Sequence, residues 1–228
     1  MTADRDFGRE LYPFLHGVAP KGDGLEILLA EVRASTVRKC RDTVELRGQL
    51  HAEYAETLVD AAEAVAAAFT RGAKLLAFGN GGSATDAADA VADCLAPPNP
   101  KWQSLPALSL VGDSAIITAL ANDVGVENVF SRQIIAYAER GDIALGISTS
   151  GNSASVVTAL AEAKRRGLLT IGLAGYDGGA MAGSGTLDFC FVARMEYVPR
   201  IQEGHATVWH TLLELVQERL ADSADMAS

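Results

Sequence analysis

The chain has 228 residues, 49% of them hydrophobic and 6% aromatic, which is long enough for one large domain with additional helices. Its net charge of −10 and the lack of an extended basic cluster beyond the group around Arg165 and Arg166 argue against a nucleic-acid partner. No apolar run reaches the ~18 residues of a membrane span and the first residues are charged, so we expect a cytoplasmic protein with no membrane partner.

The first 70 residues are predicted to be helical after an irregular start. Residues 1–24 contain Pro13, Pro20 and several glycines, which predicts an irregular N-terminal arm. In residues 25–70, apolar residues recur three and four positions apart, which predicts N-terminal helices in two segments. A long amphipathic helix outside a complete α/β unit often buries its apolar stripe against another subunit, so we expect these helices to make oligomer contacts.

Beyond Lys74 the chain alternates between apolar strands and helices, so residues 71–222 are predicted to form one domain, followed by a tail, 223–228. The predicted strands are Leu75–Phe78, Ala107–Val111, Ile143–Ile147, Leu169–Ala174 and Phe189–Val192. The predicted helices are Ala84–Leu95, Ser114–Leu120, Val126–Arg140, Ser153–Arg166 and about Ile201–Leu220. This alternation predicts an α/β fold of three layers, α/β/α, around a mostly parallel five-stranded sheet.

The first predicted strand leads into a glycine-rich turn, which precedes an alanine-rich helix and consists of Gly79, Asn80, Gly81, Gly82 and Ser83. Glycine lets backbone N–H groups approach an anion, and the helix start adds unpaired donors and the positive end of the dipole. A phosphate fits such a turn. The alternative is a sharp turn without a ligand.

A second polar turn follows the strand Ile143–Ile147. Its residues are Ser148, Thr149, Ser150, Gly151, Asn152 and Ser153. Four hydroxyls can donate to several oxygens of one phosphate monoester, whereas an N-cap and a polar turn need only one or two. In parallel sheets ligands bind outside the carboxyl ends of the strands, where both turns occur. The two turns together therefore favour a phosphorylated ligand.

The helix after the first turn carries an acidic face. Asp86, Asp89 and Asp93 lie at positions i, i+3 and i+7, and the helix Ala84–Leu95 contains no Lys or Arg. Like charges at this spacing cost roughly 0.2–0.5 kcal/mol per pair, so a compensating cation is expected. Either the face is solvated, or Asp89 and Asp93 bind a divalent ion.

Five motifs together resemble the phosphoheptose isomerase subfamily of SIS (sugar isomerase) proteins, whose fold is flavodoxin-like. The motifs are GNGGS from Gly79, ANDVGVENVFSRQ from Ala121, ISTSGNS from Ile147, GYDGG from Gly175 and RIQEGHATVWH from Arg200. The resemblance covers roughly Leu58–Leu220. It is less specific for activity than for subfamily, because the subfamily includes a non-enzymatic, DnaA-binding replication initiation regulator.

The resemblance implies roles for individual residues. Those that would hold the substrate phosphate are Ser83, Ser148, Thr149, Ser150 and Ser153, in turns that include Gly81 and Gly82. Those that would contact the sugar are Asn80, Asp123 and Gln202. The acid/base pair would be Asp93 and His210. The ligands of a divalent metal, with zinc the first choice, would be Asp89, Asp93, Gln202 and His210.

The sequence departs from the family pattern at four positions. The family has His and Glu where this chain has Asp89 and Asp93, so the acid/base carboxylate is one methylene shorter. A family arginine falls near Pro97, and a family aspartate falls at Pro199. One nitrogen and three oxygen donors suit manganese or magnesium better than the His-containing set does, and a site without metal also stays open.

The spacing of Gln202 and His210 limits how both residues can bind the same metal ion. They are eight residues apart, about 12 Å along a continuous helix, which is too far for both to reach one ion. Either Gln202 precedes the helix, or the two residues come from different chains. We favour a site shared between subunits, consistent with the homotetramer of the family. His205 is interpreted as a core histidine.

The activity that the resemblance implies is an aldose–ketose isomerase of heptose biosynthesis, converting sedoheptulose 7-phosphate to D-glycero-D-manno-heptose 7-phosphate through an enediol. Such a reaction needs a base for the proton next to the carbonyl and an acid for the oxygen. The alternative is a non-catalytic, sugar-phosphate-binding or protein-binding regulator. A nucleotide-binding Rossmann domain is disfavoured because GNGGSA lacks the GxGxxG spacing.

Overall fold

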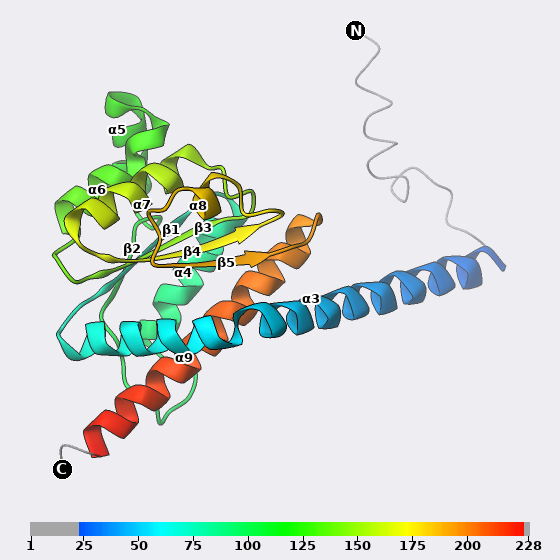
Figure 1. The fold of residues 1–228 in the computed structure, drawn as a ribbon. Helices are drawn as coiled ribbons and strands as arrows, with labels where there is room; N and C mark the ends of the chain where they lie inside the picture. Colours follow the sequence, from blue (N-terminus) through cyan, green and yellow to red (C-terminus); the bar gives the residue numbers. More distant parts are fainter. Residues whose placement is uncertain (1–22, 226–228) are drawn as a thin grey trace, which may run out of the picture. The chain divides into compact units, whose positions relative to one another are not determined.

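The computed structural model describes residues 23–225, coloured along the sequence in Figure 1. Most of the predicted arm and residues 226–228 of the predicted tail lie outside this range, whereas residues 23–24 and 223–225 are helical. The chain divides into two compact units between Asp42 and Thr43. The second unit contains the sheet and both predicted turns. None of the described helices combines the length and apolar character that a membrane crossing requires.

The sheet has five strands, all parallel, in the order β2-β1-β3-β4-β5. The strands are β1 Leu75–Gly79, β2 Ala107–Ser109, β3 Ile143–Ser148, β4 Leu169–Gly175 and β5 Phe189–Ala193. Every residue of β1 and β3 is buried, as expected for apolar strands covered on both faces. The predicted three-layer α/β/α class is confirmed, and the sheet is entirely parallel.

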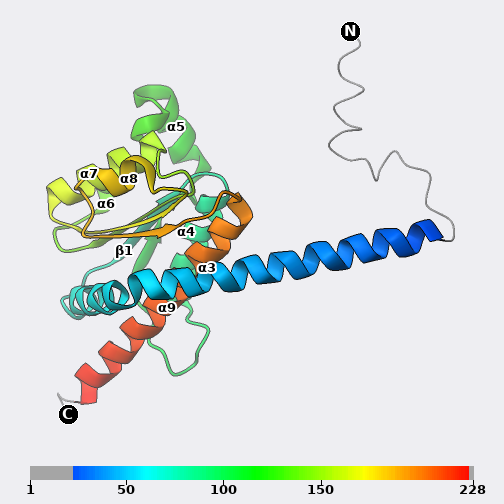
Figure 2. The ribbon, with the colours of Figure 1, turned by 45° about the vertical axis from the view of Figure 1, so that its right-hand side comes forward.

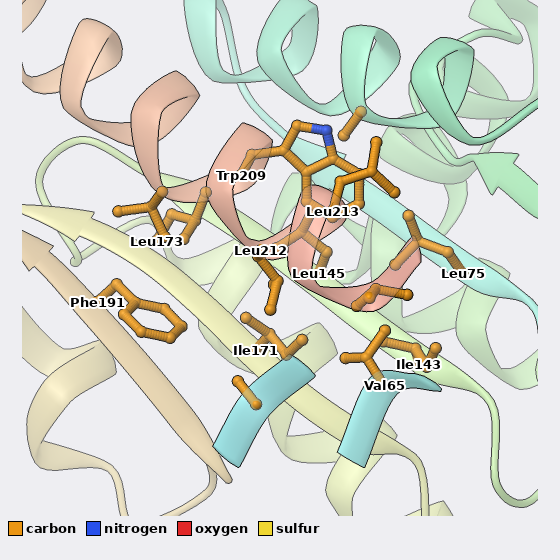
Figure 3. Packing of buried hydrophobic residues seen from close by; sticks show 14 of the residues in the cluster. Val65, Leu75, Ile143, Leu145, Ile171, Leu173, Phe191, Trp209, Leu212 and Leu213 are labelled. Carbon is orange, nitrogen blue, oxygen red and sulfur yellow. The ribbon is translucent and has the colours of Figure 1, made fainter. Parts of the chain in front are cut away.

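One face of the sheet is covered by α4 Gly82–Leu95, by α9 Val198–Asp225 and by residues 43–70 of α3 Asp23–Thr70 (Figures 1 and 2). Figure 3 shows Trp209, Leu212 and Leu213 of α9 above the strand side chains of this layer. The other face is covered by α6 Val129–Tyr137, α7 Ala154–Arg166 and the short α8 Gly179–Gly183. The helix α5 Ser114–Val124 has no fully buried residue.

The helices differ from the predictions in three places. The structure assigns one helix, α3, where the pattern predicted two segments. The predicted helix Val126–Arg140 is a 3₁₀ turn, η1 Val126–Asn128, followed by α6. The helix α9 begins at Val198 rather than at Ile201, because Pro199 lies in its first turn, where the missing N–H breaks no helical bond.

Candidate functional site

The two predicted turns lie side by side at one edge of the sheet. Strands β1 and β3 are neighbours, and Gly79 at the end of β1 is in register with Ile147 of β3. The helix after β1, α4, packs on one face of the sheet and the helix after β3, α7, packs on the other, so a crevice forms between β1 and β3 at their carboxyl ends. The edge between the turns is therefore the candidate ligand site.

The first turn has the backbone of an anion-binding loop. A Cβ on Gly79 would lie 2.6 Å from the carbonyl oxygen of Ser83, so only glycine fits this close approach. Gly81, the N-cap of α4, has φ +56°, and no side chain caps the helix. Ser83 is buried in the first turn of α4. The start of α4 is thus free of a side-chain cap where a phosphate would bind.

The second turn gathers hydroxyls around a tightly packed glycine. Ser148 Oγ donates to Ser153 Oγ at 3.0 Å, and Ser150 Oγ accepts a hydrogen bond from the backbone N–H of Asn152 at 3.2 Å. Gly151 has φ +65°, and a Cβ there would overlap the carbonyl group of Gly178. The turn is therefore packed against the residues that lead into α8.

A side-chain hydrogen bond joins the two turns. Asn80 Nδ2 donates to Ser155 Oγ, in the first turn of α7, at 2.9 Å. Ser155 is buried and is absent from the predicted site, because its contact with Asn80 depends on how the start of α7 lies beside the turn that follows β1. Asp123 lies exposed near the end of α5, where its carboxylate accepts a hydrogen bond from Asn122.

The helices α4 and α9 bring the predicted acid/base pair together. His210 Nε2 lies 3.5 Å from Asp93 Oδ2, and the indole Nε1 of Trp209 donates to the same oxygen at 3.2 Å. The side chain of His210 is 66% exposed and that of Asp93 23% exposed. The pair is therefore open to a ligand on the His210 side. Trp209 was not among the predicted residues, since its sequence position alone reads as core.

The helices α4 and α9 make a second contact about two helical turns closer to their N-terminal ends. Gln202 Nε2 donates to Asp86 Oδ2 at 3.2 Å and also packs closely against Gly82 at the start of α4. Burial raises the pKa of Asp86, the hydrogen bond from Gln202 opposes this rise, and the charge of Asp89 adds to it. Gln202 thus lies at the glycine-rich turn, whereas His210 lies at Asp93.

A small cavity of about 80 Å³ lies under these contacts. Its lining residues are Asp86, Asp89, Ile147, Leu173, His205, Ala206, Trp209 and His210. His205 is buried as expected for a core histidine, and burial lowers its pKa to about 4. Its Nε2 is 2.8 Å from the carbonyl oxygen of Ala174, whereas its Nδ1 has no hydrogen-bond partner among residues 23–225.

The predicted metal ligands of one chain do not fit a single ion. Gln202 and His210 both lie within α9, which excludes the alternative in which Gln202 precedes the helix and leaves the favoured one, a site shared between subunits, as a prediction. They face Asp86 and Asp93, respectively, two turns apart. Across residues 23–225, no three His, Cys, Asp or Glu side chains are grouped so that they could hold a metal ion. A single chain therefore does not assemble the predicted set.

Comparison with known proteins identifies the family. Residues 40–175 match the sequence model of the SIS domain. The phosphoheptose isomerase of Citrifermentans bemidjiense is 39% identical over 193 residues, which cover 85% of this chain and 97% of that protein. The phosphoheptose isomerase of Pelobacter propionicus is 45% identical over 163 residues, covering 72% and 85% of the two chains.

A solved structure shows the same architecture. The phosphoheptose isomerase of Neisseria gonorrhoeae superposes with a TM-score of 0.75 and 32% identity, covering 82% of this chain and 99% of that one. Sequence identity above 30% over most of both chains indicates membership of the same family and not only a shared fold. The chain therefore belongs to the phosphoheptose isomerase family of SIS-domain proteins, and it is an isomerase.

Proposed function

We propose that the protein interconverts sedoheptulose 7-phosphate and D-glycero-D-manno-heptose 7-phosphate by proton transfer through an enediol. The relatives named above are phosphoheptose isomerases, which supports a phosphorylated seven-carbon sugar as substrate. The observation that carries the proposal is the 3.5 Å approach of His210 to Asp93 on the helix that leaves the phosphate-binding turn. The proposed substrate anchor and one of the proposed proton-transfer groups thus belong to the two ends of one helix, α4.

The two turns would anchor the substrate by its phosphate. The start of α4 offers backbone N–H groups and the positive end of its dipole, and the second turn adds the hydroxyls of Ser148, Ser150 and Ser153. The bond from Asn80 to Ser155 fixes the distance between the two halves of this anchor. A phosphate held at both turns restricts where the remainder of the sugar can lie, which lowers the entropic barrier to reaction.

Asp93 and His210 would move the protons. One of them takes the proton from the carbon next to the carbonyl, and the other serves the carbonyl oxygen. The indole N–H of Trp209 holds Asp93 Oδ2 next to the imidazole. The enediol then loses the proton of the hydroxyl on the carbon that was first deprotonated and gains a proton on the former carbonyl carbon, which completes the exchange of aldose and ketose.

The assembly and the metal are separate parts of this proposal. A homotetramer would complete the site by bringing Gln202 of one chain to the Asp93–His210 pair of another. A divalent cation, with zinc the first choice and manganese or magnesium as alternatives, would there polarise the sugar oxygens. Because one chain does not assemble the ligand set, no proton transfer above depends on the cation. Metal content measured on the intact oligomer tests this part.

Solvent exchange tests the proposed reaction. We expect the purified protein to incorporate deuterium from D₂O into sedoheptulose 7-phosphate or its aldose product, detected by mass spectrometry. Asp93→Asn should abolish the exchange while retaining affinity for inorganic phosphate, because the two turns are unchanged. If the wild-type protein exchanges no deuterium but binds the sugar phosphate, the non-catalytic alternative replaces the isomerase.

A further inference from the structure

The hydrogen bond from Asn80 to Ser155 joins an exposed side chain to a buried one. Asn80 lies exposed in the glycine-rich turn, between Gly79 and Gly81, and its Nδ2 is 2.9 Å from Ser155 Oγ. Ser155 is 5% exposed, and the next residue of α7, Val156, is completely buried. An exposed side chain between two glycines is free to rotate, whereas a buried side chain on a packed helix is not. Ser155 is therefore the fixed partner, and Asn80 is the residue that the bond positions.

The surroundings of Asn80 leave Ser155 as the group that orients its amide. Both residues line a cavity of about 310 Å³. The other described residues of this lining are glycines, an alanine and larger apolar residues such as Val111, Ile117 and Phe130. Within residues 23–225, the side chain of Asn80 makes no hydrogen bond besides the one to Ser155. The orientation of the amide thus depends on the Ser155 hydroxyl.

This bond decides which end of the amide is available to a ligand. A primary amide carries its two donors on Nδ2 and its acceptor on Oδ1. Because Nδ2 is turned towards Ser155, Oδ1 is turned away from α7, and it has no partner in the described part of the chain. The oxygens of a phosphate dianion only accept hydrogen bonds, whereas a sugar hydroxyl can donate one. Oδ1 therefore suits the sugar part of a sugar phosphate and not its phosphate.

We propose that Ser155 is a positioning residue for substrate recognition, which holds the amide of Asn80 so that Oδ1 accepts a hydrogen bond from a hydroxyl of the sugar phosphate. The inference rests on the proposed function, because it takes sedoheptulose 7-phosphate as the ligand. Ser155 acts through Asn80 and takes no part in proton transfer, which remains with Asp93 and His210. Its contribution is to order the Asn80 side chain before the ligand binds, which reduces the entropy lost on binding.

Four variants test this role. Ser155→Ala removes only the hydroxyl that accepts the bond from Asn80, and Asn80→Ala and the double variant complete a mutant cycle. Ser131→Ala is the matched control. Ser131 is 6% exposed in α6, on the same face of the sheet as α7, and its Oγ donates to the carbonyl oxygen of Asn128 at 3.1 Å. Steady-state kinetics give kcat and KM for sedoheptulose 7-phosphate, and Ki for inorganic phosphate as a competitive inhibitor.

We expect Ser155→Ala to raise KM about fivefold, the typical effect of one hydrogen bond, and to leave kcat nearly unchanged. Ki for inorganic phosphate should not change, because the pairing of β1 with β3 also holds the two turns together. Asn80→Ala should raise KM at least as much. The double variant should match Asn80→Ala, because Ser155 then has no side chain to position. Ser131→Ala should match wild type in kcat, KM and Ki.

Three results would overturn the proposal while the isomerase assignment stands. An unchanged KM in Ser155→Ala would show that Asn80 needs no positioning. A rise in Ki equal to the rise in KM would show that the bond only holds the two turns together. If the effects of the two single variants on KM multiply in the double variant, Ser155 acts independently of Asn80. Wild-type protein that does not turn over sedoheptulose 7-phosphate overturns the proposed function and the positioning role together.

Discussion

The carboxylate of Asp93 accepts a hydrogen bond from the indole of Trp209 while it faces His210. Trp209→Phe keeps most of the buried ring and removes only the N–H. We expect kcat to fall about fivefold, since roughly 1 kcal/mol of orientation is lost, with little change in KM because the proposed phosphate anchor at the turns is unchanged. Steady-state kinetics measure the split. Trp102→Phe is the matched control. An unchanged kcat in Trp209→Phe would mean that the hydrogen bond from Trp209 is not needed to position Asp93.

The burial of His205 also links stability to pH. Its pKa is about 4 in the fold and about 6.5 in the unfolded chain, so the unfolded state binds more protons between these values. The stability that the neutral ring contributes is fully present above pH 6.5 and is lost as the pH falls towards 4, about 3 kcal/mol in all. Urea unfolding at pH 7.5 and 4.5 measures this loss. His205→Gln should lose less stability over the interval, and His51→Gln should lose as much as wild type.

At the scale of elements, Gly151 fixes the hydroxyl turn against the segment that precedes α8. A methyl group at this position would overlap the carbonyl of Gly178, and φ +65° disfavours any side chain. We expect Gly151→Ala to lower the free energy of unfolding by about 3 kcal/mol and to weaken phosphate binding. Gly72→Ala is the matched control: Gly72 has φ +86° with nothing near its added Cβ, so it should cost about 1 kcal/mol and leave phosphate binding intact. Equal losses in the two variants would show that backbone conformation, not the clash, sets the cost.

The elements that sequence predicts well are those whose signal is local. The strands β1 and β3 end within one residue of their predicted ends, because an apolar run buried on both faces is continuous and the turn after it is polar. The short α8 was not predicted, since Gly179 and Gly183 read as turn residues. The predicted start of α9 was three residues too late, and Pro199 is tolerated where it lies, in the first turn of the helix.

At the scale of the whole molecule, the sequence predicts that the two polar turns share one edge of the sheet but not which side chains of the helices meet. The turns that follow parallel strands lie at the same edge of the sheet, so the proximity of the two turns is predictable from the sequence alone. The contacts of Gln202 with Asp86 and of Trp209 with Asp93 depend on how α9 rotates and slides against α4, and no local pattern records this.

The positions of Gln202 and His210 on α9 predict how the subunits assemble. The two residues are about 12 Å apart along the helix, and they contact the carboxylates of Asp86 and Asp93, respectively. If Gln202 reaches the Asp93–His210 pair of another subunit, mixed oligomers of Asp93→Asn and Gln202→Ala chains should regain activity that neither variant has alone. Random assembly restores roughly a quarter of the sites.

Asp93→Asn mixed with His210→Asn should regain none, because Asp93 and His210 of one chain form the pair. Co-expression of differently tagged chains followed by tandem purification and the deuterium-exchange assay gives the comparison. Activity that stays absent in the Asp93→Asn and Gln202→Ala mixture would show that each site is built from a single chain, and Gln202 would then act only through its bond to Asp86.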